Sequence, residues 1–448
     1  MAIYYIDKDH PSASNSNAGT DPNLPWLSFA NMTVGGSVVV AGDTVLVRKT
    51  TTPYDLGASN DFENPAVQPA NNGSAGNLIT ISKWGDDRPV VEISSGTSGA
   101  IGAGLQSPRK KFISWEHFEI NMPGLVNKAA VLFDCDNCEL HFIKVNGKSM
   151  TTTDNHDAFR IEGTNDAIVQ DCEARDVKAG TSSPYDNSAA YKCYQNVRLL
   201  LEHCLARDCD MGLFDKGQGS VDNIFRRNLV VDCYWGMKSI QSPWDSPDVY
   251  ENIFQVSGLG LGLDTGTNPH FLNLRCFNNV FYVPLGITDV VTLRGVGVNS
   301  TDLEFYNNII HNVGGSRTIR HELTTGVLTH NRNCFQSAFS AQRHGTSYAS
   351  LGTWQSGTGF DADSFVDDPE FVDLAGEDFH LQSTSPCKGT GVAGEDMGAY
   401  PRADSTVIGP RSASTTDPGR PPVTVRPAVF ERPPVDIRPP VDLRPSVN

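Results

Sequence analysis

Four basic residues recur in strand-like stretches near the middle of the chain, where they could meet an acidic ligand. In DAFRIEG and AAYKCYQ, strand alternation leaves Arg160 and Lys192 on the outside. In GLFDKGQ and WGMKSIQ, Lys216 and Lys238 fall at or near the same level. Cations one repeat apart can neutralise carboxylates, and close lysines lower one another's pKa, which suits a general base. The column predicts binding of acidic sugars, with Lys192 and Lys216 as candidates for catalysis.

Aromatic and acidic residues flank this column. Nearby loops add Asp154, His156, Asp157, Tyr185, Asp186, Trp244 and Asp245. Tyr and Trp faces suit sugar rings, so the predicted binding set is Arg160, Lys192, Tyr194, Lys216, Lys238 and Trp244. The alternative is simple pairing of these outward cations with acids such as Glu162, Glu173 and Asp215, which is common on sheet faces. The sequence leaves surface pairing, saccharide binding and catalysis open.

A repeating structure must position these residues, because one position recurs between residues 137 and 333. It is occupied by Cys172, Cys204, Asn228, Asn252, Asn279, Asn308 and Asn333. A repeat of roughly 24 residues plus variable loops is typical of a solenoid coil, in which stacked coils bury a shared core. Asparagines at one turn can bond the backbone and each other as an internal ladder, continued by the cysteines. Separate hairpins would give periods nearer about 10 residues. The predicted fold class is therefore an all-β, right-handed parallel β-helix.

Three segments resemble the pectate-lyase-like right-handed β-helix superfamily. The opening YYIDKDHPSASNSNAGTDPNLPWLSFANM with AGDTVLVR is similar to the entry cap of such proteins. GSAGNLITISKWGDDRPVV is similar to their next coil, and DDPEFVDLAGEDFHLQSTSPCKGTG with DMGAYPR resembles their closing coil. With the ladder, the resemblance covers about residues 2–402. It implies the fold, but this fold serves lyases, hydrolases, epimerases, phage tailspikes and non-catalytic surface proteins alike.

The resemblance does not extend to a particular enzyme. The Asp-Asp calcium motifs of pectate lyases and the close acid pairs of polygalacturonases are not matched. If the protein were a lyase, the resemblance would imply Ca²⁺ as a cofactor; otherwise we expect no cofactor. Cys135 and Cys138 form a single CxxC, which is a weak zinc signal without a second pair, so we predict no metal site.

Composition and charge exclude several partners. The net charge of −17 disfavours nucleic acid, and no apolar run approaches the roughly 20 residues of a membrane span. The start, MAIYYIDKDHPS, lacks the basic and apolar regions of a secretory signal. The ten cysteines lie within apolar strand patterns, which is typical of reduced thiols in a core. We therefore expect synthesis in the cytoplasm without a signal peptide.

The C-terminal tail has a different composition, with ten of the 27 prolines after residue 402. An Arg-Pro pair returns every six residues at Arg420, Arg426, Arg432, Arg438 and Arg444. Valines return with the same period at Val423, Val429, Val435, Val441 and Val447. Proline at this density excludes helix and favours an extended or polyproline chain. A disordered linker is one reading; the strict period favours docking of residues 419–448 on a virion structural protein or on another copy of this chain.

These patterns divide the chain into four parts. We expect an N-terminal cap with first coils over 1–105, a central β-helix over 106–335, closing coils over 336–402 and the tail over 403–448. The best hypothesis is a virion-associated structural protein, such as a bacteriophage appendage or capsid-decorating β-helix, oligomeric in its assembly and able to bind surface polysaccharide. The alternative is a polysaccharide lyase or another carbohydrate-active enzyme. The residues do not decide whether the protein is an enzyme.

Overall fold

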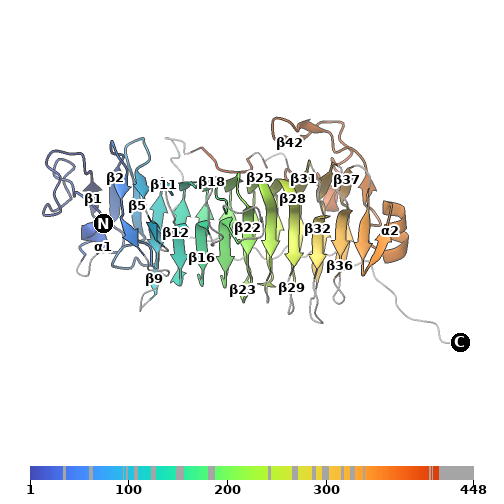
Figure 1. The fold of residues 1–448 in the computed structure, drawn as a ribbon, viewed down its shortest axis with the longest axis horizontal. Helices are drawn as coiled ribbons and strands as arrows, with labels where there is room; N and C mark the ends of the chain where they lie inside the picture. The colour runs from blue at the N-terminus through green and yellow to red at the C-terminus, as the bar shows by residue number, and fades with distance from the viewer. Residues whose placement is uncertain are drawn as a thin grey trace. The chain divides into compact units, whose positions relative to one another are not determined.

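The computed structural model is built almost entirely from parallel strands (Figure 1). It describes residues 1–33, 37–59, 64–93, 95–96, 99–104, 109–122, 128–147, 156–179, 187–240, 244–264, 271–284, 289–294, 302–313, 317–322, 328–336, 339–402, 405 and 407–412. Consecutive coils stack, so that each strand pairs in parallel with its counterpart in the next coil. The predicted right-handed parallel β-helix is confirmed.

A 12-stranded parallel sheet forms one side of the stack. Its strands are β1 (Ile3–Ile6), β2 (Thr44–Arg48), β5 (Ile79–Trp84), β10 (Ile113–Glu116), β14 (Glu139–His141), β17 (Ile168–Gln170), β20 (Leu200–Glu202), β24 (Ile224–Arg226), β27 (Asp248–Tyr250), β30 (Arg275–Phe277), β33 (Leu303–Tyr306) and β36 (Leu328–Asn331).

A 21-stranded sheet forms the other two sides, as two rows of strands joined where β25 (Leu229–Ser239) and β28 (Ile253–Asp264) run through both. The front row of Figure 1 also contains β8 (Ile101–Ala103), β12 (Lys128–Phe133), β16 (Asp157–Glu162), β19 (Ala189–Tyr194), β22 (Met211–Asp215), β32 (Asp289–Arg294), β35 (Arg317–His321), β38 (Ala341–Arg343) and the antiparallel β39 (Thr346–Tyr348). The upper row also contains β3 (Tyr54–Asp55), β6 (Val90–Glu92), β11 (Glu119–Asn121), β15 (Lys144–Asn146), β18 (Glu173–Arg175), β21 (Leu205–Arg207), β31 (Val280–Val283), β34 (Ile309–Asn312), β37 (Cys334–Gln336) and β40 (Phe365–Val366).

Short strands and helices complete the coils and their ends. The strands are β4 (Ala58–Ser59), β7 (Ser95–Gly96), β9 (Lys110–Lys111), β13 (Cys135–Asp136), β23 (Ser220–Val221), β26 (Trp244–Asp245), β29 (Phe271–Leu272), β41 (Phe371–Asp373) and β42 (Asp378–Leu381). The helices are α1 (Ala30–Thr33), α2 (Leu351–Thr358) and the 3₁₀ turn η1 (Val392–Gly394). At one end of the stack, α2 begins with a Ser350 capping box and buries Trp354 against the last coil.

The predicted ladder lies where the 12-stranded sheet turns into the upper row. The Nδ2 of Asn279 donates to Asn308 Oδ1 at 3.0 Å and to the carbonyl of Val249 at 3.0 Å, while its Oδ1 accepts from the backbone of Asn252 at 3.1 Å. The ladder asparagines are fully buried. Cysteine takes over the same role, since Cys204 Sγ donates to the carbonyl of Val169 at 3.6 Å. Each member therefore satisfies backbone groups that would otherwise be buried without partners.

The residue before each ladder position has a left-handed backbone. Arg227, Glu251, Asn278 and Asn307 have φ between 52° and 55°. Only Asn among these types favours that region, so Arg227 and Glu251 adopt it because the turn demands it. One left-handed residue followed by the ladder residue makes the short bend that repeats in every coil and keeps successive strands in register.

The ten cysteines are all buried and free, as the apolar patterns predict. Burial and the neighbouring Cys138 thiol raise the pKa of Cys135 well above its usual range, so this pair has the character of core thiols. Among the described residues, no group of three or more His, Cys, Asp or Glu side chains could hold a metal ion. The helices within the described ranges are all too short or too polar to cross a membrane.

A closing segment, residues 367–412, folds back over the upper row from the last coil (Figure 1). Met397 and Ala399 pack on Val280 and Ile309, and further along Arg411 reaches Asp171. The compact body therefore ends at Ser412 rather than at Arg402, where the closing motif of the sequence placed it. Residues 413–448, with the predicted docking repeats Arg420–Val447, lie outside the described residues.

Candidate functional site

The predicted basic residues lie on the front row, where a fixed pattern decides which side chains point outward. One outward position is aligned from coil to coil: Arg160 with Lys192, Lys192 with Phe214, and Phe214 with Lys238. The predicted column is corrected at one position: Phe214 occupies the level expected for Lys216. Lys216 lies two residues further along, beside Tyr194, because the intervening Asp215 turns inward.

Arg160 and Lys192 are held by acids rather than offered to solvent. Lys192 Nζ lies 2.6 Å from Asp157 Oδ1, and both side chains are fully buried. The same amine donates to the carbonyl of Asn187. Arg160 Nη1 lies 3.3 Å from Asp157 Oδ2, and its Nη2 lies 2.6 Å from Glu162 Oε2. Pairing with nearby acids, the alternative left open by the sequence, therefore describes both residues, but Arg160 and Lys192 are buried rather than at the surface.

The half-buried Lys216 lies at the centre of the cluster, over the ring of the buried Tyr194. The guanidinium of Arg160 lies 3.9 Å from the Tyr194 ring centre, and Lys216 Nζ lies 5.0 Å from the same ring. Burial, with Lys192 and Arg160 nearby, lowers the pKa of Lys216 to about 8. Burial raises the pKa of Tyr194, so its hydroxyl stays protonated. Among the described acids, none forms an ion pair with the half-buried Lys216.

Lys238 closes the cluster on the next coil. Its Nζ lies 3.6 Å from the centre of the Trp235 ring and 5.8 Å from that of Phe214. Lys238 and Trp235 are both half-buried, whereas Phe214 is fully buried. Cation–π contacts of this kind orient an ammonium group without neutralising it. Lys238 thus holds its ammonium group against the Trp235 ring at this end of the cluster.

Lys128 and Asp157, the first residues of β12 and β16, also belong to this cluster. The sequence did not predict that they contribute to it. Lys128 is aligned with Asp157, and burial, with Arg160 nearby, lowers the pKa of Lys128 to about 8. Asp157 appeared only as a loop residue in the sequence reading, yet it begins β16 and anchors Lys192. The signal that could have found them is alignment of KAAVLF with DAFRIE in successive coils.

Other predicted residues have different surroundings. Trp244 is fully buried with its ring 6.3 Å from Phe225, so it offers no exposed face to a sugar. Asp215, considered as a surface acid, faces inward and accepts bonds from Gly217 N at 2.8 Å and Asn223 Nδ2 at 3.1 Å. Burial raises the pKa of Asp215 to about 6. His156 is buried, and Asp154, Tyr185 and Asp186 lie outside the described residues.

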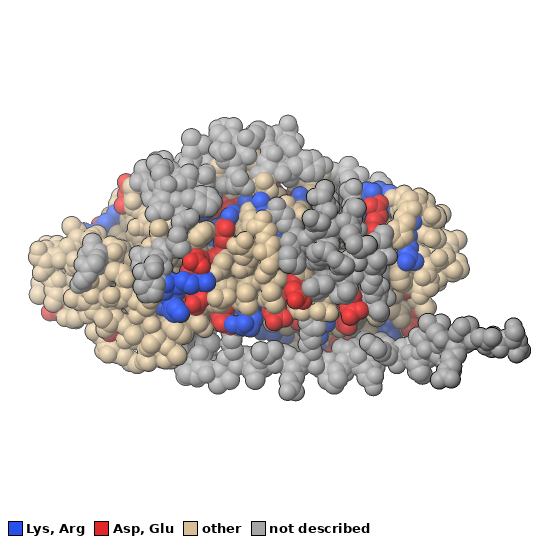
Figure 2. All heavy atoms as spheres, turned by 90° about the horizontal axis from the view of Figure 1, so that it is seen from below, with Lys and Arg blue, Asp and Glu red and all other residues tan. Residues whose placement is uncertain are grey.

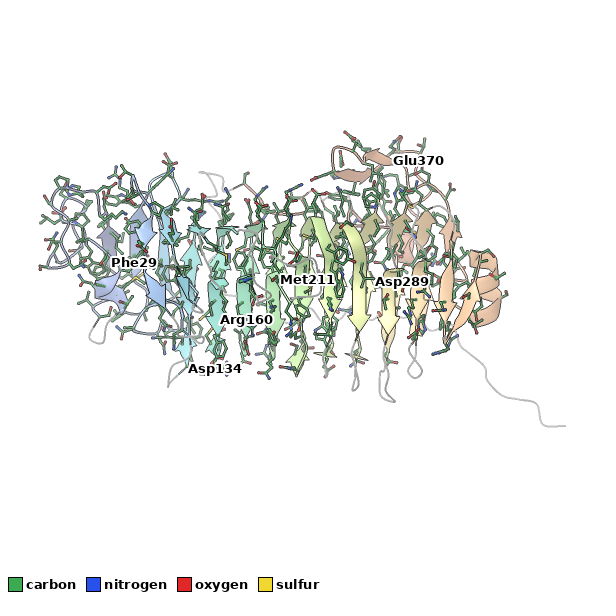
Figure 3. All side chains as sticks on the ribbon, in the orientation of Figure 1. Phe29, Asp134, Arg160, Met211, Asp289 and Glu370 are labelled. Atoms are coloured by element: carbon green, nitrogen blue, oxygen red, sulfur yellow. The ribbon has the colours of Figure 1, made fainter. Side chains whose placement is uncertain are left out.

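The remaining surface carries mixed charges. Seen from below, basic and acidic side chains alternate along the described surface instead of separating into zones (Figure 2). At the lower edge, near Asp134 in Figure 3, Arg109 Nη2 lies 3.0 Å from Asp134 Oδ1 and Lys111 Nζ lies 3.1 Å from Asp136 Oδ2. Such exposed pairs neutralise each other locally.

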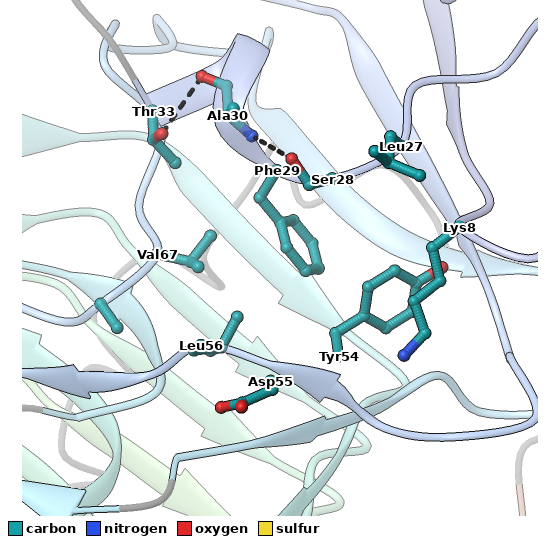
Figure 4. Close-up of a pocket in the computed structure, with 11 residues that line it drawn as sticks. Lys8, Leu27, Ser28, Phe29, Ala30, Thr33, Tyr54, Asp55, Leu56 and Val67 are labelled. Carbon is teal, nitrogen blue, oxygen red and sulfur yellow. Dashed lines mark hydrogen bonds between the residues drawn. The ribbon is translucent and has the colours of Figure 1, made fainter. Parts of the chain in front are cut away.

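A hollow of about 520 Å³ lies at the N-terminal cap (Figure 4). Phe29, Tyr54 and Val67 line it, and Lys8 lies at its rim. The Lys8 amine already donates to Thr52 Oγ1 at 2.9 Å and to the carbonyl of Pro53 at 2.6 Å. These bonds hold the Lys8 amine over the Tyr54 ring, 5.2 Å from its centre. The hollow is therefore lined mainly by apolar side chains, and its lysine is already hydrogen-bonded to the protein.

Comparisons with known proteins find likeness in structure. The sequence matches no protein-family model and no curated protein. A solved complex of XylC with xylose has a TM-score of 0.47 and 11% identity over 83% of this chain and 87% of that chain. Pectate lyase Pel9A has a TM-score of 0.45 and 12% identity over 90% of this chain and 96% of that chain. A rhamnogalacturonan lyase has a TM-score of 0.43 and 14% identity over 84% of this chain and 91% of that chain.

Proposed function

We propose that this protein binds acidic polysaccharides on its front row, through Lys216 and Lys238. The observation that carries the proposal is the half-buried Lys216, which lies over the Tyr194 ring and forms no ion pair with a described acid. Among the described residues, Lys128, Arg160, Lys192 and Lys216 lie near the carboxylates of Asp157 and Glu162, and Lys238 lies beside Phe214 on the next coil. Asp157 and Glu162 pair with Lys192 and Arg160, whereas Lys216 forms no ion pair with a described acid and is the amine placed to meet a ligand carboxylate.

The aromatic rings favour a sugar over a simple anion. Tyr194 lies under Lys216, and Trp235 lies under Lys238. A pyranose ring has an apolar face, so aromatic side chains beside cations suit a sugar acid better than an inorganic anion. Coils of a parallel sheet repeat about every 4.8 Å, so ligand groups on successive sugar units can meet successive coils.

Binding of polygalacturonate by calorimetry tests the proposal. Lys216→Ala and Lys238→Ala should each weaken binding about fivefold or more at low salt, and added salt should weaken binding by the intact protein. Lys49→Ala is the matched control, since Lys49 is an exposed lysine near the N-terminal cap and pairs only weakly with Asp87 at 3.8 Å. Equal affinity of all three variants and the intact protein for several polyuronates would exclude this site.

A second candidate function is β-elimination at the same site, favoured by the lowered pKa of Lys216, about 8. The neutral amine of Lys216 could remove the C5 proton of a uronate; the C4–O bond then breaks, and the leaving oxygen takes up a proton. Lys192 is not suited to this step, because it is buried against Asp157. Elimination creates unsaturated ends that absorb in the ultraviolet. No absorbance rise over a panel of uronate polymers would argue against a lyase while leaving the binding proposal intact.

We also propose that the protein is a virion-associated component, carried at the virion surface and docked through its tail on a virion protein or on another copy. The support is the sequence period of Arg420, Arg426, Arg432, Arg438 and Arg444 with its valines. Each repeat offers a guanidinium for a carboxylate or carbonyl and a valine for a shallow apolar pocket. A chain that ends at Ser412 should then fail to enter the particle.

A further inference from the structure

The front row carries an apolar shelf beside the cation cluster. We define it as the half-buried Trp235, Ile240 and Leu259, backed by the fully buried Ala189, Met211 and Phe214. Ala189, Met211 and Phe214 form a small cluster separate from the interior core. Trp235 and Ile240 pack on this cluster and stay partly exposed, so the outer face presents apolar side chains beside the lysines.

Charged positions bracket this shelf along one outward column. The column begins with the aligned Lys128 and Asp157 and ends with Asp289 and Arg317, which lie 2.5 Å apart. Between these ends stand the aligned Met211, Trp235 and Leu259. Figure 3 places Met211 between Arg160 and Asp289 along the front row. The outward column is thus apolar from Ala189 to Leu259, which covers the coils of Lys216 and Lys238 and one coil on either side.

Leu259 extends the shelf across the face of the next coil. Gly262 is aligned with Lys238, and a Cβ at Gly262 would lie 2.5 Å from Leu259 Cδ2. The Leu259 side chain therefore covers the outward position where a neighbouring polar side chain would otherwise stand. A ligand group that contacts Lys238 meets Trp235 on its own coil and Leu259 on the next.

We propose that the site selects acidic polysaccharides that carry O-acetyl groups next to the bound carboxylate, an inference that rests on the proposed polysaccharide binding. The ligand carboxylate meets Lys216 and Lys238, and the acetyl methyl covers Trp235 and Ile240. Lys238 Nζ lies 3.6 Å from the Trp235 ring centre, so charge and apolar contact are adjacent within one sugar unit. Burial of one methyl group on this shelf should strengthen binding about five- to tenfold.

The test compares two forms of one polymer with the same charge. Polygalacturonate with chemically added acetyl groups and the same sample after mild alkaline deacetylation differ in the acetyl groups alone. The intact protein should bind the acetylated form about five- to tenfold more tightly in calorimetry. Ile240→Thr should reduce this preference to about twofold or less and leave affinity for the deacetylated polymer unchanged. Leu27→Thr, which changes an exposed leucine (45% accessible) of the N-terminal cap, is the matched control.

The outcomes separate the two proposals. Equal binding of both polymer forms by the intact protein would overturn acetyl selection and leave polysaccharide binding in place. Binding of neither form would overturn both. A preference that survives unchanged in Ile240→Thr and in a second variant, Trp235→Gln, would also overturn the assignment of the shelf. Far-ultraviolet circular dichroism and thermal unfolding show that each variant is folded.

Discussion

Lys192 and Lys216 stand on adjacent coils, yet their amines have different surroundings. The Lys192 side chain is fully buried and pairs with Asp157, so its charge is neutralised inside the protein. Lys216 lies above Tyr194 and Phe214 at 5.0 Å and 5.5 Å from the ring centres, and burial lowers its pKa to about 8. The same residue type therefore serves stability in one coil and is available for ligand chemistry in the next.

Removal of the Lys192 amine should destabilise the protein. Lys192→Met leaves the fully buried carboxylate of Asp157 with Arg160 alone, which should cost about 3 kcal/mol in the free energy of unfolding. Denaturant unfolding measures this loss, with Lys238→Met as a control expected to stay within about 0.5 kcal/mol. The double variant Asp157→Asn with Lys192→Met should recover much of the loss. An unchanged midpoint in Lys192→Met would show that Lys192 is not a structural ion-pair partner.

Binding of acidic polymers should depend on pH through Lys216. Because its lowered pKa is about 8, Lys216 is charged below that pH and loses its charge as the pH rises through about 8. An ordinary lysine would keep its charge up to about pH 10. Affinity for polygalacturonate at constant ionic strength should fall between about pH 7 and pH 9. In Lys216→Arg this fall should be much smaller, because arginine stays charged; a similar fall in both proteins would assign it to another group.

At the scale of the coil, the sequence predicts those features in which the same residue type returns in every coil. The ladder from Asn228 to Asn333 was readable because each turn needs the same donors and acceptors. The left-handed residue before each ladder position could not be predicted, because residues such as Arg227 and Glu251 share a backbone angle but no side-chain type. On the front row, two neighbouring inward residues precede the outward one, as Ala190 and Tyr191 precede Lys192, so simple alternation could not fix the level of Lys216. Local alternation also gave no sign that Trp244 is buried by contacts distant in sequence.

The ladder prediction is sharpest at Asn279, in the middle of the series. Asn279→Leu removes the acceptor for the Asn252 backbone and the donor to Val249, both in a dry interior, and should cost about 3 kcal/mol or more. Asn279→Cys should cost less, because cysteine at Cys204 donates to the equivalent carbonyl at 3.6 Å. Denaturant unfolding ranks the variants. If leucine were tolerated as well as cysteine, polar satisfaction would not be what the ladder supplies.

At the scale of the whole body, the closing segment seals the apolar half of the upper row. Outward positions there change from Glu173 to Leu229, Ile253 and Val280, and residues of the closing segment pack on this apolar part. The segment continues past the DMGAYPR motif to Arg411, whose Nε and Nη2 lie 2.9 Å and 2.6 Å from the two carboxylate oxygens of Asp171. The closing segment extends to Arg411 because it contacts coils that are distant in sequence, and the DMGAYPR motif gives no sign of these contacts.

Two truncations should separate closure from tail function. A chain that ends at Arg402 loses the contact between Arg411 and Asp171; because Arg411 is partly exposed and truncation returns Asp171 to water, the loss should cost about 1 kcal/mol. A chain that ends at Ser412 keeps this contact and should unfold like the intact protein. Thermal unfolding and limited proteolysis compare the two. Equal stability of both chains would mean that residues 403–412 contribute nothing to the body.

The chain that ends at Ser412 also tests what the tail does. A spacer needs composition but no register, whereas Arg420, Arg426, Arg432, Arg438 and Arg444 keep a strict period with proline after each. Proline stiffening reduces the entropy lost when an extended chain docks, and after one repeat has bound, the others bind at high effective concentration. Loss of residues 413–448 should therefore abolish incorporation into the particle while polysaccharide binding persists. Shuffling the residues after Pro418 keeps composition and length but destroys the period, so it should fail in the same way. If the shuffled tail supported incorporation, the segment would act as a linker and the docking proposal would be wrong.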